Sequence, residues 1–367
     1  MKGLVNNESG MALLVVMAVI SVLLVGALQL ARNTGEAALA TGSGADRFLA
    51  REQAIAGLHL GMALLAADGE AGEETDSIQE DWARPEQVAK AVEAMGYNSE
   101  SLVVEITDEL GKLQINALLK QYPGREQNPD QYKLWERFLD ELDPDIDPVP
   151  ILNCLQDWLD SRDDEAVTGL SGAESDYYLS LDVPYTCTNG PFGHISEIFL
   201  VKDITPELFK TDRESADEED GDSETIVPEE MITVHGLDTE DTTEGRYKYT
   251  GKVNINTAPE AVIQTLLPLG SEDLAEDLVE YREERADGGE SFTNSLDKGW
   301  AAQVIQLSGK EQVAFDGLIR YDSDLFNIRS QSTRNQARTT ISALIRRAKD
   351  ETSGKWSCRI LQVTEDI

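Results

Sequence analysis

The sequence predicts an α+β fold in which a long N-terminal helix packs on a C-terminal antiparallel sheet, with a large, mainly helical segment between them. Three observations lead to this fold class. The apolar stretch Met11–Leu30 continues into an apolar stripe with helical spacing. Residues near the C-terminus alternate between apolar and polar, as in strands that bury one face. The segment between these regions is acidic and has mostly helical spacing.

Met11–Leu30 is long and apolar enough to cross a membrane. Its 20 residues carry no formal charge, and only Ser21 and Gln29 have polar side chains. A helix of this length spans roughly 30 Å, the thickness of a bilayer core. The run continues into Arg32 without a small-residue cleavage site, so we expect it to be retained rather than removed as a signal peptide. Taken alone, this stretch also fits a plain membrane anchor.

The helix is expected to continue well beyond the apolar span. Apolar side chains lie on one helical face at Phe48, Ile55, Leu58, Met62 and Leu65. We predict one helix over 11–66, with a weakening near the glycines of 41–44. The glycine-rich acidic run 69–75 should end it.

The middle of the chain combines short β-rich runs with helices. The runs 102–107 and 112–116 flank a polar turn and predict a β-hairpin. A further strand is predicted over 195–201, and the acidic run 211–225 predicts a solvated loop because its like charges repel. Helices are predicted over 130–142, 151–161, 271–285 and 295–307, and a strand that turns into a helix over 251–270.

Three stretches at the C-terminus predict a three-stranded antiparallel meander. In each stretch, alternate residues share one face that can be buried. These sets are Phe326, Ile328 and Ser330, then Ile341, Ala343 and Ile345, then Trp356, Cys358 and Ile360.

One short element occurs twice. GKLQINA at 111–117 is echoed by GKVNINTA at 251–258. Both copies place a short strand before an asparagine, whose side chain can cap a following helix. We infer two related helical subdomains, each entered by this element; chance similarity over seven residues is the alternative.

Charge and motifs exclude several classes of function. The net charge of −38 over 367 residues argues against a general affinity for nucleic acid or anionic membranes. The sequence has no HExxH, CxxC, GxSxG or P-loop motif, and its histidines, His59, His194 and His235, are scattered. We therefore expect that the protein is not an enzyme.

Carboxylates are concentrated around the end of the helix predicted at 151–161. Two lie one helical turn apart, two follow in the loop, and two return after a turn that contains glycine. Hard oxygen ligands crowded in this way repel one another unless a cation compensates, and Ca²⁺ accepts six to eight such oxygens. We predict a Ca²⁺ site with the candidate ligands Asp157, Asp160, Asp163, Asp164, Glu174 and Asp176. A solvated acidic loop is the alternative.

Cys154 and Cys187 are predicted to form a disulfide. The chain has three cysteines, and an oxidising compartment would permit one bond and leave Cys358 free. The chosen pair flanks one acidic segment, and closing a loop of that length contributes roughly 3 to 4 kcal/mol. Three buried free cysteines are the alternative.

Residues 253–258 and the helices after them are similar to the entry of helix-hairpin-helix modules, some of which bind DNA. Those modules hold a phosphate on the amides of a glycine-rich turn. The turn here, 267–273, has one glycine and two acidic residues where the phosphate would lie. We expect no nucleic-acid binding.

The N-terminus resembles the type IV pilin class of precursors. In that class, an inner-membrane prepilin peptidase cleaves after a glycine and methylates the new first residue, which implies cleavage between Gly10 and Met11 here. Most members carry a glutamate at the fifth mature position, where this chain has Val15. An isolated carboxylate in lipid is costly unless it meets a partner, so its absence indicates a subunit at a filament tip.

Taken together, the motifs resemble the protein K family of type II secretion, a family of minor pseudopilins. The matching segments cover nearly the whole chain: the Gly10 site, LGKLQINAL at 110–118, LQDWLDSRDDE at 155–165, GAESDYY at 172–178 and KVNINTAP at 252–259. The resemblance implies a pilin-like fold with a large α-helical insertion of two SAM-like parts. It implies a leader at 1–10, a transmembrane half of the helix at 11–30, and the rest of the helix with the first strands at 31–107. The insertion would follow at 108–310, with SAM-like parts at about 110–195 and 250–310. The meander would occupy 311–367.

The resemblance also implies a function. It implies assembly with minor pseudopilins I and J into a complex that caps the major pseudopilin filament and contacts secreted cargo or the outer-membrane secretin. It implies a single-pass inner-membrane protein with a cytoplasmic N-terminus and a periplasmic C-terminal domain, and calcium and a disulfide in the insertion fit the family. Two alternatives are a minor pilin of a type IV pilus and a single-span envelope protein whose SAM-like or helix-hairpin-helix-like helices bind a protein or nucleic acid.

Overall fold

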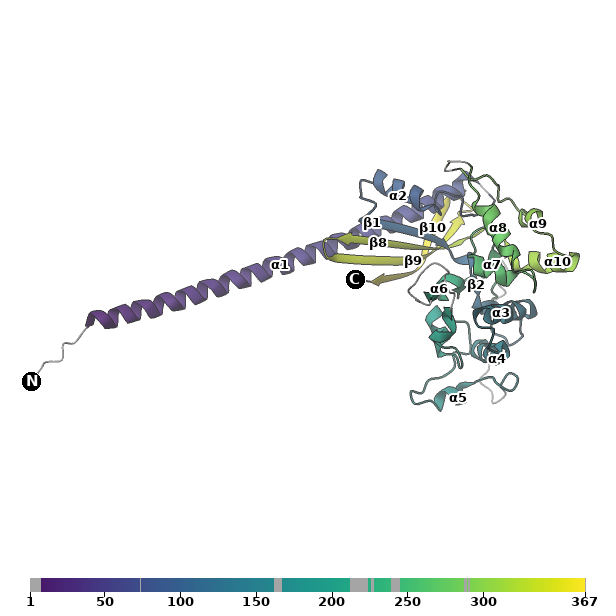
Figure 1. Ribbon diagram of the computed structural model, residues 1–367, viewed down its shortest axis with the longest axis horizontal. Helices are drawn as coiled ribbons and strands as arrows, with labels where there is room; N and C mark the ends of the chain where they lie inside the picture. Colours follow the sequence, from purple (N-terminus) through teal and green to yellow (C-terminus); the bar gives the residue numbers. More distant parts are fainter. Residues whose placement is uncertain are drawn as a thin grey trace, which may run out of the picture.

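The computed structural model describes residues 8–72, 74–161, 167–211, 224–225, 228–238, 245–286, 289 and 291–366. A single long helix, α1, leaves a body that contains the strands and the other helices (Figure 1). The helices are α1 (Glu8–Ala71), α2 (Pro85–Ala94), α3 (Pro129–Leu142), α4 (Pro148–Leu159), α5 (Ser175–Leu179), α6 (Pro228–Met231), α7 (Glu260–Leu266), α8 (Leu274–Glu283), α9 (Ala301–Val304) and α10 (Gly309–Leu318). The strands are β1 (Leu102–Asp108), β2 (Leu113–Gln114), β3 (Lys210–Thr211), β4 (Glu224–Thr225), β5 (Ile232–Thr233), β6 (Val253–Asn254), β7 (Ile319–Arg320), β8 (Leu325–Arg334), β9 (Ala337–Lys349) and β10 (Trp356–Asp366).

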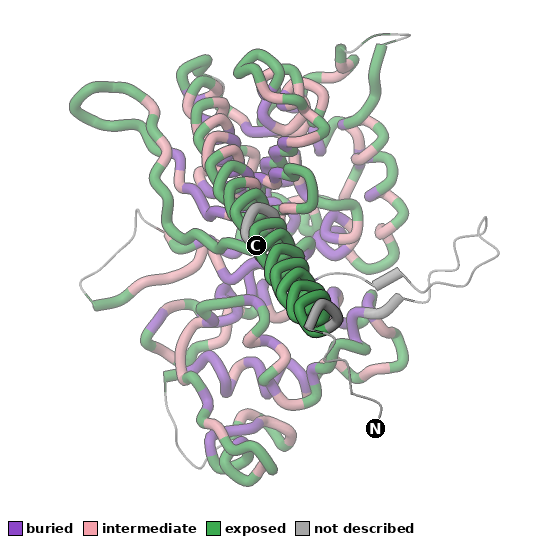
Figure 2. Tube along the Cα trace, turned by 90° about the vertical axis from the view of Figure 1, so that its left-hand side faces the viewer, coloured by how far each residue is buried: buried purple, intermediate pink, exposed green. Residues whose placement is uncertain are grey.

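The first half of α1 projects away from the body. The helix runs without a break from Glu8 to Ala71, so the weakening predicted near 41–44 is not present. The side chains of 11–36 are exposed, and Ala50 is the first described side chain that is buried. Figure 2, in which α1 projects toward the viewer, shows this exposure along its visible length. Within the described residues, α1 is the one helix long and apolar enough to cross a membrane.

Four antiparallel strands form one sheet in the order β1-β8-β9-β10. The predicted C-terminal meander is confirmed as β8, β9 and β10. β1 pairs along its whole length with β8, from Leu102 opposite Ser332 to Asp108 opposite Phe326. The predicted α+β fold class, with a long helix packed on an antiparallel sheet, is therefore confirmed.

Glycines on α1 allow the helix to approach the sheet closely. A Cβ atom added at Gly57 would lie 2.2 Å from Oγ of Ser330 and 2.8 Å from Cγ2 of Val104. One added at Gly61 would lie 2.9 Å from Cγ2 of Ile328. The close contact closes an apolar core whose buried members include Ala54, Leu58, Leu65, Phe326, Ile328, Ile341, Ala343 and Ile345.

The predicted hairpin of 102–107 with 112–116 is wrong. β1 pairs with β8, whereas β2 pairs in parallel with β5. The side chain of Asp108 accepts a hydrogen bond from the amide of Leu110 at 2.8 Å and starts a 3₁₀ turn, Glu109–Gly111. This turn leads the chain out of the sheet instead of folding it back on β1.

The predicted strand over 195–201 is also wrong, because Ile195–Leu200 forms a 3₁₀ helix. The ring Nδ1 of His194 accepts a hydrogen bond from the amide of Ser196 at 3.1 Å. The carboxylate of Glu197 accepts one from the amide of His194 at 2.9 Å. These local bonds form a capping box, which selects a helical turn over a strand.

Most of the predicted helices are present. α3, α4, α7 and α8 lie at the predicted positions, and the segment predicted over 295–307 contains only the short α9. α10 was not predicted. Most of the acidic run 211–225 lies outside the described residues.

The two copies of the repeated element occupy equivalent places in two modules of the insertion. β2 pairs in parallel with β5, and β6 pairs in parallel with β7. Asn116 donates to the carbonyl of Val234 at 2.6 Å, and Asn256 donates to that of Tyr321 at 3.3 Å. Val234 lies two residues after Ile232, the first residue of β5. Tyr321 likewise lies two residues after Ile319, the first residue of β7.

The predicted helix-capping role of these asparagines is wrong. Both side chains are fully buried and join segments distant in sequence. Oδ1 of Asn116 accepts from the amide of Phe192 at 2.8 Å, and Oδ1 of Asn256 accepts from Nε1 of Trp300 at 2.6 Å. A buried amide with satisfied donors and acceptors fixes the relative position of its partners. The SAM-like nature of the two parts stays a prediction.

Replacing Gly57 with alanine should destabilise the body by about 1 to 3 kcal/mol, because the added methyl group overpacks the interface between α1 and the sheet. Urea unfolding of the full chain in detergent, followed by near-ultraviolet circular dichroism, measures this. Gly42→Ala is the matched control, since nothing lies within 4 Å of a Cβ atom there. Equal stability of the two variants would contradict the packing described above.

Candidate functional site

Three of the six predicted calcium ligands lie together at the end of α4. The carboxylate oxygens of Asp157, Asp160 and Glu174 come within 4.8 Å of one another. Their side chains are almost completely buried, with residues 1%, 2% and 5% exposed. We call this group the α4 acidic cluster.

The loop that returns to α4 is shaped to hold the Asp157 carboxylate. The amide of Thr168 donates to both of its oxygens, at 2.9 and 3.1 Å. A Cβ atom added at Gly172 would lie 2.1 Å from Oδ2 of Asp157, so only glycine permits this approach. Asn153 on α4 donates to Oγ of Ser171 at 3.0 Å and holds the same loop against the helix.

The α4 acidic cluster places three carboxylates close together in a buried site. Burial raises the pKa of Asp157, although hydrogen bonds from Thr168 and the charge of Arg125 oppose this shift. Nε of Arg125 lies 3.9 Å from Oδ2 of Asp160. Ionised carboxylates this close repel one another, and a bound cation would relieve that repulsion.

Among the described residues, the remaining predicted ligand Asp176 is not part of this cluster. Asp176 lies on α5 and is exposed. Asp163 and Asp164 lie outside the described residues. The complete ligand set therefore stays a prediction, with Asp157, Asp160 and Glu174 brought together by the fold.

Cys154 and Cys187 lie close to the α4 acidic cluster as buried cysteines that are not joined in a disulfide. Sγ of Cys154 donates to the carbonyl of Ser171 at 3.3 Å, and Sγ of Cys187 to that of Asp157 at 3.6 Å. Burial raises the pKa of the Cys154 thiol to about 12. The predicted disulfide is not formed in this structure and stays a prediction.

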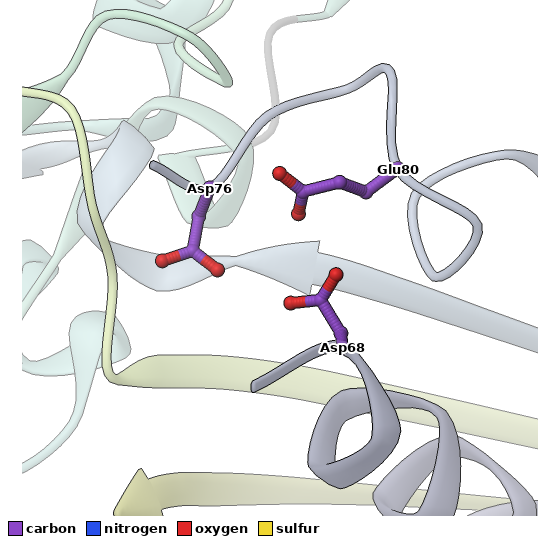
Figure 3. Close-up of side chains that lie close together, drawn as sticks. All are labelled: Asp68, Asp76 and Glu80. Atoms are coloured by element: carbon purple, nitrogen blue, oxygen red, sulfur yellow. The ribbon is translucent and has the colours of Figure 1, made fainter. Parts of the chain in front are cut away.

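A second group of carboxylates, not predicted from the sequence, lies where α1 ends. Oxygens of Asp68, Asp76 and Glu80 come within 4.8 Å of one another (Figure 3). Glu80 accepts a hydrogen bond from Nε1 of Trp82. Burial and the neighbouring charges of Asp68 and Asp76 raise the pKa of Glu80 to about 9.

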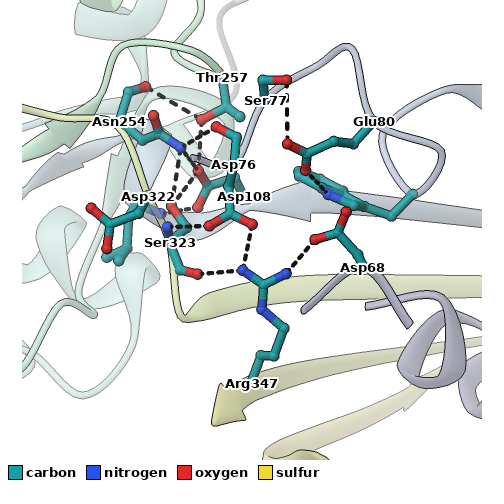
Figure 4. Close-up of polar contacts among 12 residues, drawn as sticks. Asp68, Asp76, Ser77, Glu80, Asp108, Asn254, Thr257, Asp322, Ser323 and Arg347 are labelled. Carbon is teal, nitrogen blue, oxygen red and sulfur yellow. Dashed lines mark hydrogen bonds and ion pairs between the residues drawn. The ribbon is translucent and has the colours of Figure 1, made fainter. Parts of the chain in front are cut away.

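Arg347 on β9 compensates this second group. Its guanidinium donates to Asp68 and Asp76 and also to the carbonyl of Ser323, at 3.0 Å (Figure 4). The amide of Ser323 donates to Asp76 at 2.7 Å. Because Arg347 supplies positive charge to Asp68 and Asp76, we interpret this group as a structural junction.

Asp108 continues the junction into the insertion. Its Oδ2 accepts hydrogen bonds from Nδ2 of Asn254 at 2.8 Å and from the hydroxyls of Thr257 and Ser323, both at 2.6 Å. Burial raises its pKa to about 6, against the effect of these hydrogen bonds. The end of β1, the start of the second module and the chain entering β8 therefore meet at one carboxylate.

Comparisons with known proteins agree with this architecture. Residues 111–213 match the family model described as type II secretion system (T2SS), protein K. The chain is 31% identical over 206 residues to the type II secretion system protein K of Pseudomonas aeruginosa, covering 54% of this chain and 58% of that protein. It is 23% identical over 209 residues to the protein of the same name from Pectobacterium carotovorum subsp. carotovorum, covering 56% and 61%. The matches thus span less than two thirds of the length of these relatives.

The fold is similar to that of a chain in the solved GspK-GspI-GspJ complex from the type 2 secretion system of enterotoxigenic Escherichia coli. The TM-score is 0.55, and the similarity covers 89% of this chain and 99% of that one. Sequence identity is 16%, so this likeness shows a shared fold. The resemblance to the protein K family predicted from the sequence is confirmed.

Replacing Asp108 with asparagine should change how stability depends on pH. The pKa of Asp108 is raised to about 6 in the folded state. Protonation of its carboxylate therefore stabilises the folded state, and this stabilisation is complete below about pH 4. The stabilisation is lost as the pH rises through 6. The difference in free energy of unfolding between wild type and Asp108→Asn should therefore be larger at pH 4 than at pH 7. We expect this change to be about 2 kcal/mol.

Urea unfolding of the full chain in detergent at several pH values measures this change. Asp322→Asn, at an exposed carboxylate next to Ser323 in the chain before β8, is the control. A difference between wild type and Asp108→Asn that stays constant from pH 4 to pH 7 would contradict the role given to Asp108.

Proposed function

We propose that this chain, which carries a protein K domain over 111–213, is a minor pseudopilin that caps the pseudopilus of a type II secretion system. The observation that carries the proposal is the position of the insertion. It lies at the end of the sheet opposite to the one from which the exposed half of α1 leaves (Figure 1). A filament subunit with this shape supports assembly and protein export mechanically rather than catalytically.

The exposed half of α1 supports a membrane role. Met11–Leu30 has no charged side chain and projects from the body without burial against it. Such a surface is stable in lipid or against neighbouring apolar helices, and not in water. The proposed course is anchoring in the inner membrane with the N-terminus in the cytoplasm and the body in the periplasm. During assembly, the helix then moves from lipid into the helical core of the filament.

The insertion supports a position at the filament tip. In a filament built from parallel α1 helices, a further subunit would have to pack beyond the distal end of this sheet, where the insertion lies. Val15, at the position of the usual glutamate, has no carboxylate to pair with a subunit further out. The chain is thus suited to be the first subunit, with the others added below it.

The proposed partners follow from this position. The solved chain of similar fold is part of a GspK-GspI-GspJ complex. We extend that assembly to this chain, with proteins I and J as its direct neighbours and the major pseudopilin below them. The prepilin peptidase is the proposed processing enzyme, and the outward-facing insertion is the surface proposed to meet secreted cargo or the secretin.

Calcium is the proposed cofactor of the α4 acidic cluster. The three described donors are carboxylates, which suit Ca²⁺, and Gly172 lets the carboxylate of Asp157 approach the returning loop closely. Asp157, Asp160 and Glu174 would hold the ion. Its charge would relieve the repulsion among them and secure the loop over 167–174 on the end of α4.

Replacing Gly10 with valine should block processing, because the peptidase requires a small residue before the cleaved bond. The precursor should accumulate at full mass, and secretion should fall to the level of a strain without the protein. Intact mass of the membrane-extracted chain measures this, with wild type starting at N-methylated Met11. Gly3→Val, elsewhere in the leader, should be processed normally. Mature protein from the Gly10 variant would refute the pilin-class precursor.

Calcium should raise the melting temperature of the full chain. At a free Ca²⁺ concentration about 100 times the Kd, the expected stabilisation is about 2.7 kcal/mol. Glu174→Gln should remove most of this rise, whereas Asp176→Asn, outside the cluster, should keep it. Thermal unfolding in detergent with Ca²⁺ or EDTA measures the effect. A wild-type melting temperature independent of Ca²⁺ would refute the calcium proposal, and a rise kept by Glu174→Gln would place the ion elsewhere.

A further inference from the structure

A cluster of arginines interrupts the strongly acidic character of the chain. A pocket of about 600 Å³ is lined by Arg47, Arg329, Gln336, Ala337, Arg338, Thr340 and Asp366. The chain as a whole carries a net charge of −38, but this lining has three guanidinium groups and one carboxylate. We call it the arginine pocket.

The fold brings these arginines from three elements to one end of the sheet. Arg47 lies on α1, one turn before the helix becomes buried at Ala50. Arg329 on β8 follows the buried Ile328 and therefore faces away from α1, and Arg338 lies near the start of β9. Figure 1 shows the turn between β8 and β9 at the end of the sheet from which the exposed half of α1 leaves.

The arginines of the pocket are less well paired inside the chain than their neighbours. Arg51, also on α1, donates to both carboxylate oxygens of Glu365 at 2.7 and 3.1 Å. In contrast, Arg329 lies 3.8 Å from Glu105, with both side chains more than half exposed. Arg338 donates to the neutral amide oxygen of Gln331. Exposed pairs at such distances contribute little, so the pocket keeps most of its positive charge.

Guanidinium groups bind carboxylates and phosphates through paired hydrogen bonds, so the two candidate ligands are protein carboxylates and lipid headgroups. The length of α1 distinguishes between these two candidate ligands. If Leu30 ends the span, the 17 residues to Arg47 place the pocket roughly 25 Å beyond the hydrocarbon core. The headgroup layer adds only about 5 to 8 Å on each side. Lipid phosphates are therefore out of reach of the pocket.

We propose that the arginine pocket binds carboxylates on the neighbouring filament subunit that packs against the membrane-facing end of this sheet. This inference rests on the proposed function, because it requires a subunit below the cap. The rest of the chain is acidic and would repel an acidic surface of the neighbouring subunit. The arginine pocket therefore also determines which face of this chain contacts that neighbour.

The test measures binding of the full mature chain in detergent to a purified pair of the I and J pseudopilins from the same system. The variant reverses two charges, Arg329→Glu with Arg338→Glu. Lys133→Glu with Lys310→Glu makes the same change in net charge at exposed positions on α3 and α10. We expect the arginine variant to raise the Kd by about tenfold or more at 0.15 M salt and to reduce its salt dependence, whereas the lysine variant should do neither.

Folding is checked by comparing melting temperatures, and Arg329→Gln with Arg338→Gln replaces the charge reversal if that variant does not fold. Equal binding by wild type and the arginine variant would overturn the inference and leave the proposed function standing. Absence of binding by wild type would overturn both. The arginine variant is also compared with wild type for binding to phosphatidylglycerol vesicles. If the variant binds these vesicles more weakly but binds the I and J pair as wild type does, the ligand is lipid phosphate and the carboxylate assignment is overturned.

Discussion

The guanidinium of Arg347 is the contact on which the arrangement of the body depends. It lies 6% exposed between Asp68 at the end of α1, Asp76 in the following loop and the carbonyl of Ser323. Breaking a buried pair of this kind leaves an uncompensated charge, which costs about 3 to 5 kcal/mol. The segments that meet at Arg347 are therefore restricted to one relative position.

Asp108 extends this restriction to the insertion. Its carboxylate receives hydrogen bonds from Asn254 and Thr257 of the second module and from Ser323 of the chain that returns to the sheet. The insertion is thus joined to the sheet by a buried polar network in addition to chain connections. A rigid attachment of this kind is what a cap requires, because a freely moving insertion would leave the distal end of the sheet accessible to a further subunit.

Local patterns predicted the parts of the fold that depend on local interactions. The span Met11–Leu30 and the alternation in β8 and β9 follow from periodicity, and both are present. The pairing of β1 with β8 was missed because it joins residues more than 200 positions apart, such as Asp108 and Phe326. Hairpin signals in neighbouring runs gave no information on that partner.

In the candidate site, too, local sequence patterns predicted some features, whereas contacts between distant residues were missed. Asp157 and Asp160 could be placed at one helix end by their spacing, and the glycine of the returning turn indicated that Glu174 comes back to them. The contact between Arg347 and Asp76 spans 271 residues and has no local signal. The repeated GKxxIN element did mark both module entries, but the buried role of its asparagines depends on partners such as Val234 and Tyr321.

The central claim, that this chain occupies the tip of a pseudopilus, is tested most directly by locating it in assembled filaments. A gold-labelled tag at the exposed turn around Gly354, viewed by electron microscopy, would report its position. A subunit at the tip should give a single label at one end of each filament and none along its length. Labels at regular intervals along the filament, or filaments without any label, would contradict it.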